Sequence, residues 1–186
     1  MTHALSHASR YITATTLLLS QPAAQGNARV TVAPSLDVQA HALDGDTLSI
    51  DLRLLGVDAF ETHQLCRTAA GKCSACGKAA RRYLKQLMFQ DTNSRGRKTI
   101  GISFVATSSY GRPIITAVSN GTDVGLSLIR AGHAVPATQY LTSDQARAQS
   151  YLDAFADAKA AKRGAHSGAW ITPSAWRRGQ RLGCTS

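Results

Sequence analysis

The sequence predicts an α+β domain built on a small β-barrel. Two observations lead to this fold class. Strand-like segments, one helical pattern, further strands and then further helices follow one another along the chain, without an internal repeat or a long linker. The length of 186 residues, with a hydrophobic fraction of 44%, suits one domain with a sizeable core and terminal extensions. We therefore expect one folded domain.

The first strands are expected at residues 36–43, 47–50 and 52–57. These segments are rich in β-forming residues or alternate weakly between apolar and polar ones, and Asp and Gly bound them. Asp44-Gly45-Asp46-Thr47 separates the first two, and an Asp-Gly pair is a common way to make a tight turn.

A helix is expected at residues 75–89, because apolar residues recur there at helical spacing and four cations fall on the other face. Two further strands are expected at residues 99–106 and 113–118, joined by a turn that contains Tyr110-Gly111-Arg112. Thr122 is the predicted cap of a short helix at residues 123–130. Ser143 is the predicted cap of a longer helix that runs to residue 163 and stops at Gly164.

The charge is unevenly distributed. The chain has 21 Lys and Arg against 11 Asp and Glu, a net charge of +10, and Glu61 is its only glutamate. Five of the acids lie between Asp44 and Glu61, whereas residues 67–98 and 159–181 are strongly basic. Such a pattern suits a cation site within a surface that binds polyanions, and a solvated face with an Asp-rich turn is the simpler alternative.

Residues 1–26 are interpreted as a signal peptide. They contain no acid, an apolar run that ends at Leu19, and small residues from Ala24 to Gly26. A disordered or weakly helical tail is the alternative. No segment approaches the ~20 apolar residues that span a bilayer, so we expect a secreted or periplasmic protein without a membrane span.

The four cysteines are Cys66, Cys73, Cys76 and Cys184. An even number after an export signal favours disulfides, with Cys66 paired to Cys76 because Gly71 allows the chain to turn back, and Cys73 left to pair with Cys184. Two alternatives stay open. His63 and the first three cysteines could hold zinc, although their spacing is irregular for a structural site, or the thiols could be free.

The acidic segment also carries the candidate chemistry. A hairpin between Asp46 and Asp58 would bring both carboxylates to one end of a sheet, where they would bind a hard cation such as Ca²⁺ or Mg²⁺. Glu61, three residues further on, is then placed to take a proton from an attacking water. Arg53 and Arg112 supply guanidinium forks that match phosphate oxygens and stay charged.

Tyr110 and Tyr140 are candidate substrate-binding residues, because aromatic rings stack on bases or hydrogen-bond to phosphate. The position of Tyr110 beside Arg112 favours this role. A structural role is the favoured interpretation for Tyr140.

In its ordered set of motifs the chain resembles the staphylococcal nuclease (thermonuclease) family. The resemblance covers roughly residues 36–180 and includes exported bacterial members. The matching motifs are Asp44-Gly-Asp-Thr47, Arg53-Leu-Leu-Gly-Val-Asp58 with Glu61, Tyr110-Gly-Arg112, and GTDVGLSLIRAGHA at residues 121–134.

The resemblance implies a five-stranded OB-type barrel with three helices over residues 27–186, and a calcium-dependent endonuclease that cleaves DNA and RNA with little sequence preference. Asp46, Asp58 and the Ala59 carbonyl would hold Ca²⁺. Arg53 and Arg112 would clamp the scissile phosphate, and Glu61 would act as general base or orient the water. The protein is expected to be a monomer.

The sequence departs from the family pattern at several points. Ala59-Phe60 stands where the family usually has Thr-Pro, which removes a hydroxyl and a rigid ring. The short spacing from Asp46 to Arg53 would place the hairpin turn at Ile50-Asp51, which lacks the Gly or Asn that tight hairpins prefer. Ser108 or Ser109 replaces an acid before the Tyr-Gly-Arg turn. These departures motivate the alternative function, a catalytically impaired OB-fold module that binds nucleic acid.

Overall fold

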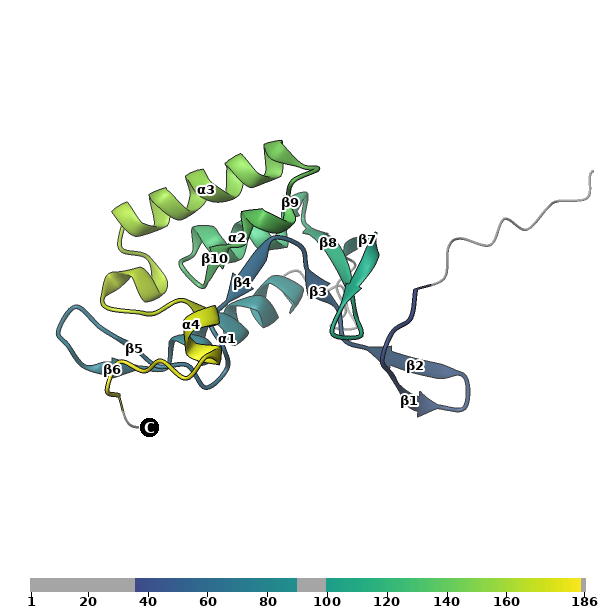
Figure 1. Ribbon diagram of the computed structural model, residues 1–186, viewed down its shortest axis with the longest axis horizontal. Helices are drawn as coiled ribbons and strands as arrows, with labels where there is room; N and C mark the ends of the chain where they lie inside the picture. Colours follow the sequence, from purple (N-terminus) through teal and green to yellow (C-terminus); the bar gives the residue numbers. More distant parts are fainter. Residues whose placement is uncertain (1–35, 90–99, 185–186) are drawn as a thin grey trace, which may run out of the picture. The chain divides into compact units, whose positions relative to one another are not determined.

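The computed structural model describes residues 36–89 and 100–184 (Figure 1). The expected signal peptide, and the cations Arg95, Arg97 and Lys98, lie outside the described residues. The strands of the described part are β1 Ala40–Asp44, β2 Thr47–Ile50, β3 Arg53–Leu54, β4 Val57–Ala59, β5 Cys66–Arg67, β6 Cys73–Ser74, β7 Gly101–Ser109, β8 Arg112–Ser119, β9 Thr122–Asp123 and β10 Ala134–Pro136. The helices are α1 Cys76–Phe89, α2 Val124–Arg130, α3 Gln145–Ala160 and α4 Pro173–Arg177.

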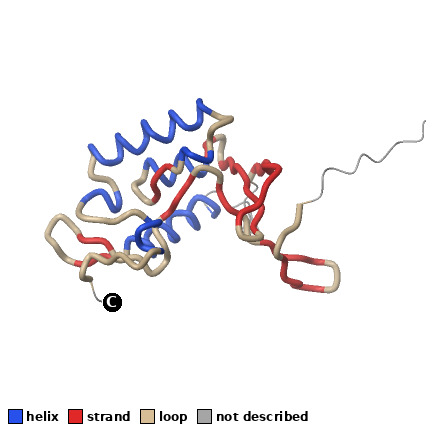
Figure 2. Tube along the Cα trace, viewed as in Figure 1, coloured by secondary structure: helices blue, strands red, loops and turns tan. Residues whose placement is uncertain are grey.

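The longest strands, β7 and β8, form the expected antiparallel hairpin (Figure 2). Tyr110 and Gly111 connect them with φ angles of 53° and 71°, the left-handed values of a two-residue turn. Burial alternates along β8, so one face, which includes Ile115 and Ala117, is directed into the core. β3 pairs with β8 in parallel and β9 pairs with it antiparallel. The turn at Tyr110-Gly111-Arg112 is confirmed.

The hairpin expected between Asp46 and Asp58 is not formed. β2 pairs with β1 around the Gly45-Asp46 turn, and β4 pairs with β10, so the two aspartates belong to separate sheets. The physical reason is that Ile50-Asp51 lacks the Gly or Asn of a tight hairpin turn, and the next strand, β3, pairs with β8 instead of β2. The described strands form four separate sheets and no closed barrel, so the five-stranded OB-type barrel stays a prediction.

The α+β class is confirmed, with corrections to the helices. The described residues contain four α-helices where three were expected, because a short helix, α4, forms near the C-terminus. Asp123, not Thr122, caps α2 and accepts a hydrogen bond from the Leu126 N–H at 2.8 Å. Asp144, not Ser143, caps α3. In both places a carboxylate one residue later takes the cap, because it accepts the orphan N–H groups at least as well as a hydroxyl.

Two hydrophobic clusters make up the described core. The larger one packs β4, β8 and β10 against α2 and α3, with Leu128 and Ile129 of α2 almost completely buried. The smaller one lies under the start of α1 and includes Phe60, Cys66, Cys76, Ala80 and Ala165, with Trp170 packed against it. The residues after Asp58 therefore connect the two clusters, and this position decides how the candidate site is held.

Both expected disulfides are present, Cys66–Cys76 and Cys73–Cys184. They use all four cysteines, so the zinc site with His63 and the free thiols are both wrong. The physical reason is that a sulfur in a disulfide is not a thiolate and cannot act as a metal ligand. The second disulfide joins residues 111 positions apart and ties the C-terminal segment to β6.

Candidate functional site

The loop that carries Glu61 begins where β4 ends. Phe60, one residue before Glu61, is only 3% exposed and packs edge-on against Trp170 with ring centroids 5.7 Å apart. Full burial of a Phe side chain stabilises by about 1.5–3 kcal/mol. The departure Ala59-Phe60 therefore replaces the rigidity of a proline ring by an aromatic anchor in the smaller core cluster.

Gln64 fixes the same loop through hydrogen bonds. Its side chain is completely buried, and its Oε1 accepts from the Glu61 N–H at 3.1 Å. Its Nε2 donates to the Ile171 carbonyl at 2.9 Å, which links the loop to the C-terminal segment. A buried amide left without partners costs about 1–3 kcal/mol, so this residue holds both chain segments in place. Sequence reasoning missed Gln64, because a single Gln beside a predicted loop carries no distinctive pattern.

The start of α1 packs directly on the backbone of Glu61. A Cβ atom added at Gly77 would overlap the Glu61 carbonyl oxygen, which is a backbone atom and cannot rotate away. Glycine is therefore required at this helical position despite its low helix propensity. The backbone of Glu61 is held by α1 on one side and by Gln64 on the other.

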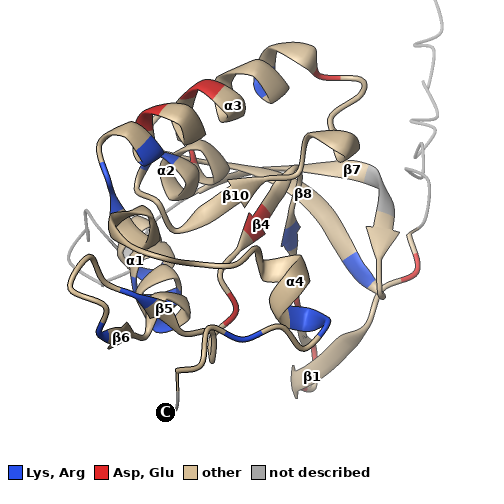
Figure 3. Cartoon of the chain, turned by 60° about the vertical axis from the view of Figure 1, so that its left-hand side comes forward, with Lys and Arg blue, Asp and Glu red and all other residues tan. Residues whose placement is uncertain are grey.

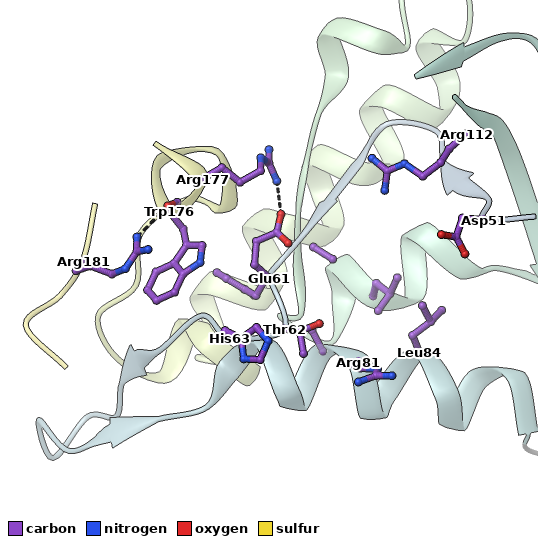
Figure 4. Close-up of a pocket in the computed structure, with 14 residues that line it drawn as sticks. Asp51, Glu61, Thr62, His63, Arg81, Leu84, Arg112, Trp176, Arg177 and Arg181 are labelled. Carbon is purple, nitrogen blue, oxygen red and sulfur yellow. Dashed lines mark hydrogen bonds and ion pairs between the residues drawn. The ribbon is translucent and has the colours of Figure 1, made fainter. Parts of the chain in front are cut away.

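Arg177 of α4 forms ion pairs with both Asp58 and Glu61. Figure 4 shows its contact with Glu61, and Figure 3 shows basic positions of α4 in blue and acidic positions of β4 in red. Arg177 Nη1 donates to Asp58 Oδ1 at 2.9 Å and to Glu61 Oε1 at 2.6 Å, and its Nη2 donates to Asp58 Oδ2 at 3.0 Å. The pKa of the Arg177 guanidinium is raised above its ordinary value. The hydrogen bond to Asp58 is the largest cause, and the hydrogen bond to Glu61 adds to it. One guanidinium thus pairs with both carboxylates. Sequence reasoning missed this role, because 116 residues separate Arg177 from Glu61.

Glu61 lines an open cleft of about 1100 Å³. Arg112 from β8 and Asp51 line the same cleft, and Figure 4 shows Arg112 across it from Glu61. Arg81 of α1 and Arg181 of the C-terminal segment add two more cations. The guanidinium of Arg181 stacks on Trp176, 3.6 Å from the ring centroid. The cleft therefore combines the only glutamate with several arginines, a lining suited to a phosphate group.

The structure brings some of the predicted site residues together and leaves others apart. Asp58, Glu61 and Arg112 lie at or beside the cleft. Arg53 lies on β3, half-buried, and is not among the residues that line the cleft. Tyr110 is 86% exposed in its turn and Tyr140 is 64% exposed.

Asp46 is exposed in the β1–β2 turn, where its carboxylate accepts a hydrogen bond from the hydroxyl of Thr47.

Within the described residues, no three metal-ligating side chains of the His, Cys, Asp and Glu types converge. Two do: Asp58 Oδ1 and Glu61 Oε1 lie within 2.9 and 2.6 Å of the same cationic nitrogen of Arg177. Ca²⁺ prefers hard carboxylate oxygens as ligands, and two of them converge here on one positive charge. Asp58 is therefore suited to act as a ligand of a cation. Ala59 belongs to β4, where it is paired with Ala134.

An open cleft with a glutamate, an aspartate and several arginines, on a mixed α+β fold, defines a candidate phosphoryl-transfer site. The family model described as staphylococcal nuclease homologue matches residues 51–167, more than half of the chain. The chain therefore belongs to the staphylococcal nuclease homologue family, whose members are nucleases. The match includes Asp58, Glu61 and Arg112, and excludes Asp46 and Arg177. No curated protein gives a significant match to the chain.

Proposed function

We propose that this protein is an exported, calcium-dependent phosphodiesterase that hydrolyses DNA and RNA with little sequence preference. One observation carries the proposal: Glu61 and Arg112 line the same cleft, and Asp58 is held beside Glu61. Membership of a nuclease family supports the same class of reaction. None of the described helices combines the length and the apolar character needed to cross a membrane.

Glu61 is the proposed general base or water-orienting group. Its side chain is 40% exposed and its backbone is held on two sides, so the carboxylate is accessible from the cleft at a defined position. Arg112 is proposed to bind the scissile phosphate with its guanidinium fork and to stabilise the charge of the transition state. Arg53 is proposed as the second arginine of this clamp.

Asp58 is the proposed central calcium ligand, with Asp46 and the Ala59 carbonyl as further ligands. The convergence of the Asp58 and Glu61 oxygens supports Asp58. When bound, calcium would supply a hard Lewis acid at the phosphate. Because Asp46 is exposed in the turn of the β1–β2 hairpin, this hairpin has to dock at the site for Asp46 to contribute.

DNA and RNA are the proposed substrates, and the cations of α1 support a polyanionic partner. Lys78, Arg81, Arg82 and Lys85 are all exposed on one side of this helix, opposite the apolar side. Tyr110, beside Arg112, is the proposed base-stacking residue, and Tyr140 is a second candidate. Two disulfides favour an oxidising compartment, in line with a cleaved leader at residues 1–26 and a secreted or periplasmic location. A monomer stays a prediction.

The test is digestion of a plasmid and of an RNA by the purified chain with Ca²⁺ and with EDTA. We expect cleavage of both substrates that stops on chelation. We also expect the cleavage rate to fall about a hundredfold in Glu61→Gln. The amide has nearly the same shape as the carboxylate, but it cannot accept a proton from the attacking water. Cleavage that continues in EDTA at full rate would contradict the calcium dependence.

The second candidate is a catalytically impaired module that binds nucleic acid. The observation in its favour is that Arg177 occupies both Asp58 oxygens and one Glu61 oxygen, while Asp46 belongs to a separate sheet. This candidate predicts binding of single-stranded DNA that weakens steeply with salt, together with no cleavage under any metal condition.

A further inference from the structure

The position of Arg177 in the site is fixed by the fold of the C-terminal segment. Residues 168–184 follow the part of the chain that matches the family model. Arg67 holds this segment at two points: its backbone N–H donates to the Ala169 carbonyl at 2.8 Å, and its Nη2 donates to the Leu182 carbonyl at 2.9 Å. The Cys73–Cys184 disulfide closes the end of the segment. α4 therefore lies between anchored points.

The segment carries three arginines close together, and only one of them pairs with the acids. Arg181 stacks on Trp176 and donates to the Trp176 carbonyl at 2.9 Å. Arg178 is exposed, and its side chain makes no hydrogen bond or ion pair within the described residues. Arg177 alone makes three charge-assisted hydrogen bonds. The contact with the acids is therefore selective and not a general effect of basic charge.

The hydrogen bonds of Arg177 use the atoms that a metal ion would need. Both oxygens of Asp58 accept from Arg177, and the Asp58 side chain is only 15% exposed, so little of its carboxylate is left for another cation. Two carboxylates at one point repel each other unless a positive charge lies between them. Arg177 supplies this charge and keeps the acids together.

We propose that Arg177 is a resident counter-ion that positions Asp58 and Glu61 in the metal-free protein and competes with a divalent cation for the same oxygens. The inference rests on the proposed cation site at Asp58. A divalent cation bound at the Asp58 oxygens would lie next to the Arg177 guanidinium and would be repelled by its charge, so cation binding displaces Arg177 from these oxygens. The C-terminal segment thereby sets the cation concentration at which the site fills.

The test is calcium binding measured by isothermal titration calorimetry on the full oxidised chain, without nucleic acid. Arg177→Gln is compared with the wild type and with Arg178→Gln, the same change in charge one residue away. We expect Arg177→Gln to bind Ca²⁺ roughly tenfold more tightly than the wild type, because charged hydrogen bonds of this type contribute about 1.4 kcal/mol or more in competition. Arg178→Gln should bind like the wild type.

The possible results separate this inference from the proposed function. Equal calcium affinity in the wild type and Arg177→Gln overturns the inference and leaves the calcium-dependent function standing. If Arg177→Gln binds calcium and the wild type does not, the inference is supported, and Arg177 blocks the site in the wild type. No binding by either protein overturns both. Equal tightening in Arg177→Gln and Arg178→Gln also overturns the inference, because it would be an effect of net charge.

A second variant and a thermal measurement cover the case in which Arg177→Gln folds poorly. The second variant, Arg177→Lys, keeps the charge but cannot hold two carboxylates with one fork, so we expect its gain in calcium affinity to be intermediate. In EDTA both variants should melt below the wild type, and saturating Ca²⁺ should restore most of the difference, because the cation replaces the lost charge. A purely structural role of Arg177 predicts the same loss of Tm with and without Ca²⁺, and that result would overturn the proposal.

Discussion

Two acidic segments lie close together in the sequence and are held in different ways. The first, Asp44 to Thr47, is a turn between β1 and β2, which pair only with each other among the described strands. The second, Asp58 to Glu61, is held by residues from distant parts of the chain, Trp170 and Arg177, and through Gln64 by the Ile171 carbonyl. The carboxylates of the first segment are exposed, whereas Asp58 is mostly covered.

The difference teaches that an acidic motif becomes a defined site only where long-range contacts hold it. A turn such as Asp44-Gly45-Asp46 forms from its own residues and needs no partner. The position of Glu61 depends on a buried aromatic ring, a buried amide and a glycine that allows close approach. Three predictions test this comparison.

The largest effect is expected from removing the Cys73–Cys184 disulfide. The double variant Cys73→Ser/Cys184→Ser should lose about 4 kcal/mol of unfolding free energy, since the disulfide closes a loop of 111 residues in the unfolded chain. Urea unfolding of the variant and the wild type measures the loss. A loss below about 1 kcal/mol would show that the Arg67 and Gln64 contacts suffice to hold the C-terminal segment.

The second effect compares the two aspartates directly. Asp58→Asn should lower the rate of DNA cleavage about a hundredfold, or ~3 kcal/mol, because it removes a charge at the centre of the site. Asp46→Asn should lower the rate tenfold or less, because docking the exposed hairpin at the site costs free energy that offsets much of what its carboxylate contributes. Initial rates at saturating Ca²⁺ measure both. Equal losses would indicate that the hairpin is docked at the site in the active protein.

The smallest effect concerns His166, which is 7% exposed within the cluster that anchors Phe60. Burial lowers its pKa below the ordinary value, and the nearby charges of Lys159 and His133 lower it further. The native state therefore binds the proton less well than the unfolded state, and the unfolding free energy should fall as the pH drops below about 6.5. Urea unfolding between pH 8 and pH 5 measures this slope.

The control is His166→Gln. The slope of unfolding free energy against pH should become shallower but not vanish, because burial and the charge of Arg82 also lower the pKa of His133. Protonation of His166 should also loosen the Glu61 loop, because the Phe60 ring, which anchors this loop, packs against the His166 ring with centroids 6.5 Å apart. An unchanged slope in the variant would assign the pH dependence to other groups.

Much of the local structure could be predicted from the sequence. The helix at α1 with its exposed cations, the Tyr110-Gly111 turn and the Cys66–Cys76 disulfide follow from spacing and residue type within short segments. Cys73–Cys184 was predicted only as the pair that remained. The helix caps were each one residue off, because Thr122-Asp123 and Ser143-Asp144 offer two acceptable caps in succession. The short helix α4 was missed, because its five residues carry too little periodicity.

The candidate site was predicted in its residue types and only partly in its geometry. Glu61, Asp58 and Arg112 were identified because carboxylates and arginines in this order suit phosphate chemistry. The pairing of Asp46 with Asp58 depended on which strands meet, and that choice is made by the whole sheet. Gln64, Gly77 and Arg177 gave no signal, because their roles lie in contacts with the backbone or side chain of Glu61.

The amino-acid sequence by itself determined the class of the fold, the family and the identity of the acids and arginines that the proposed chemistry needs. These properties depend on composition, periodicity and short motifs, which are local. Only the tertiary structure decided that Arg177 pairs with Asp58 and Glu61, and that Asp46 lies in a separate hairpin. The physical reason is that such ion pairs join residues more than a hundred positions apart, and burial and close packing of the intervening chain select them.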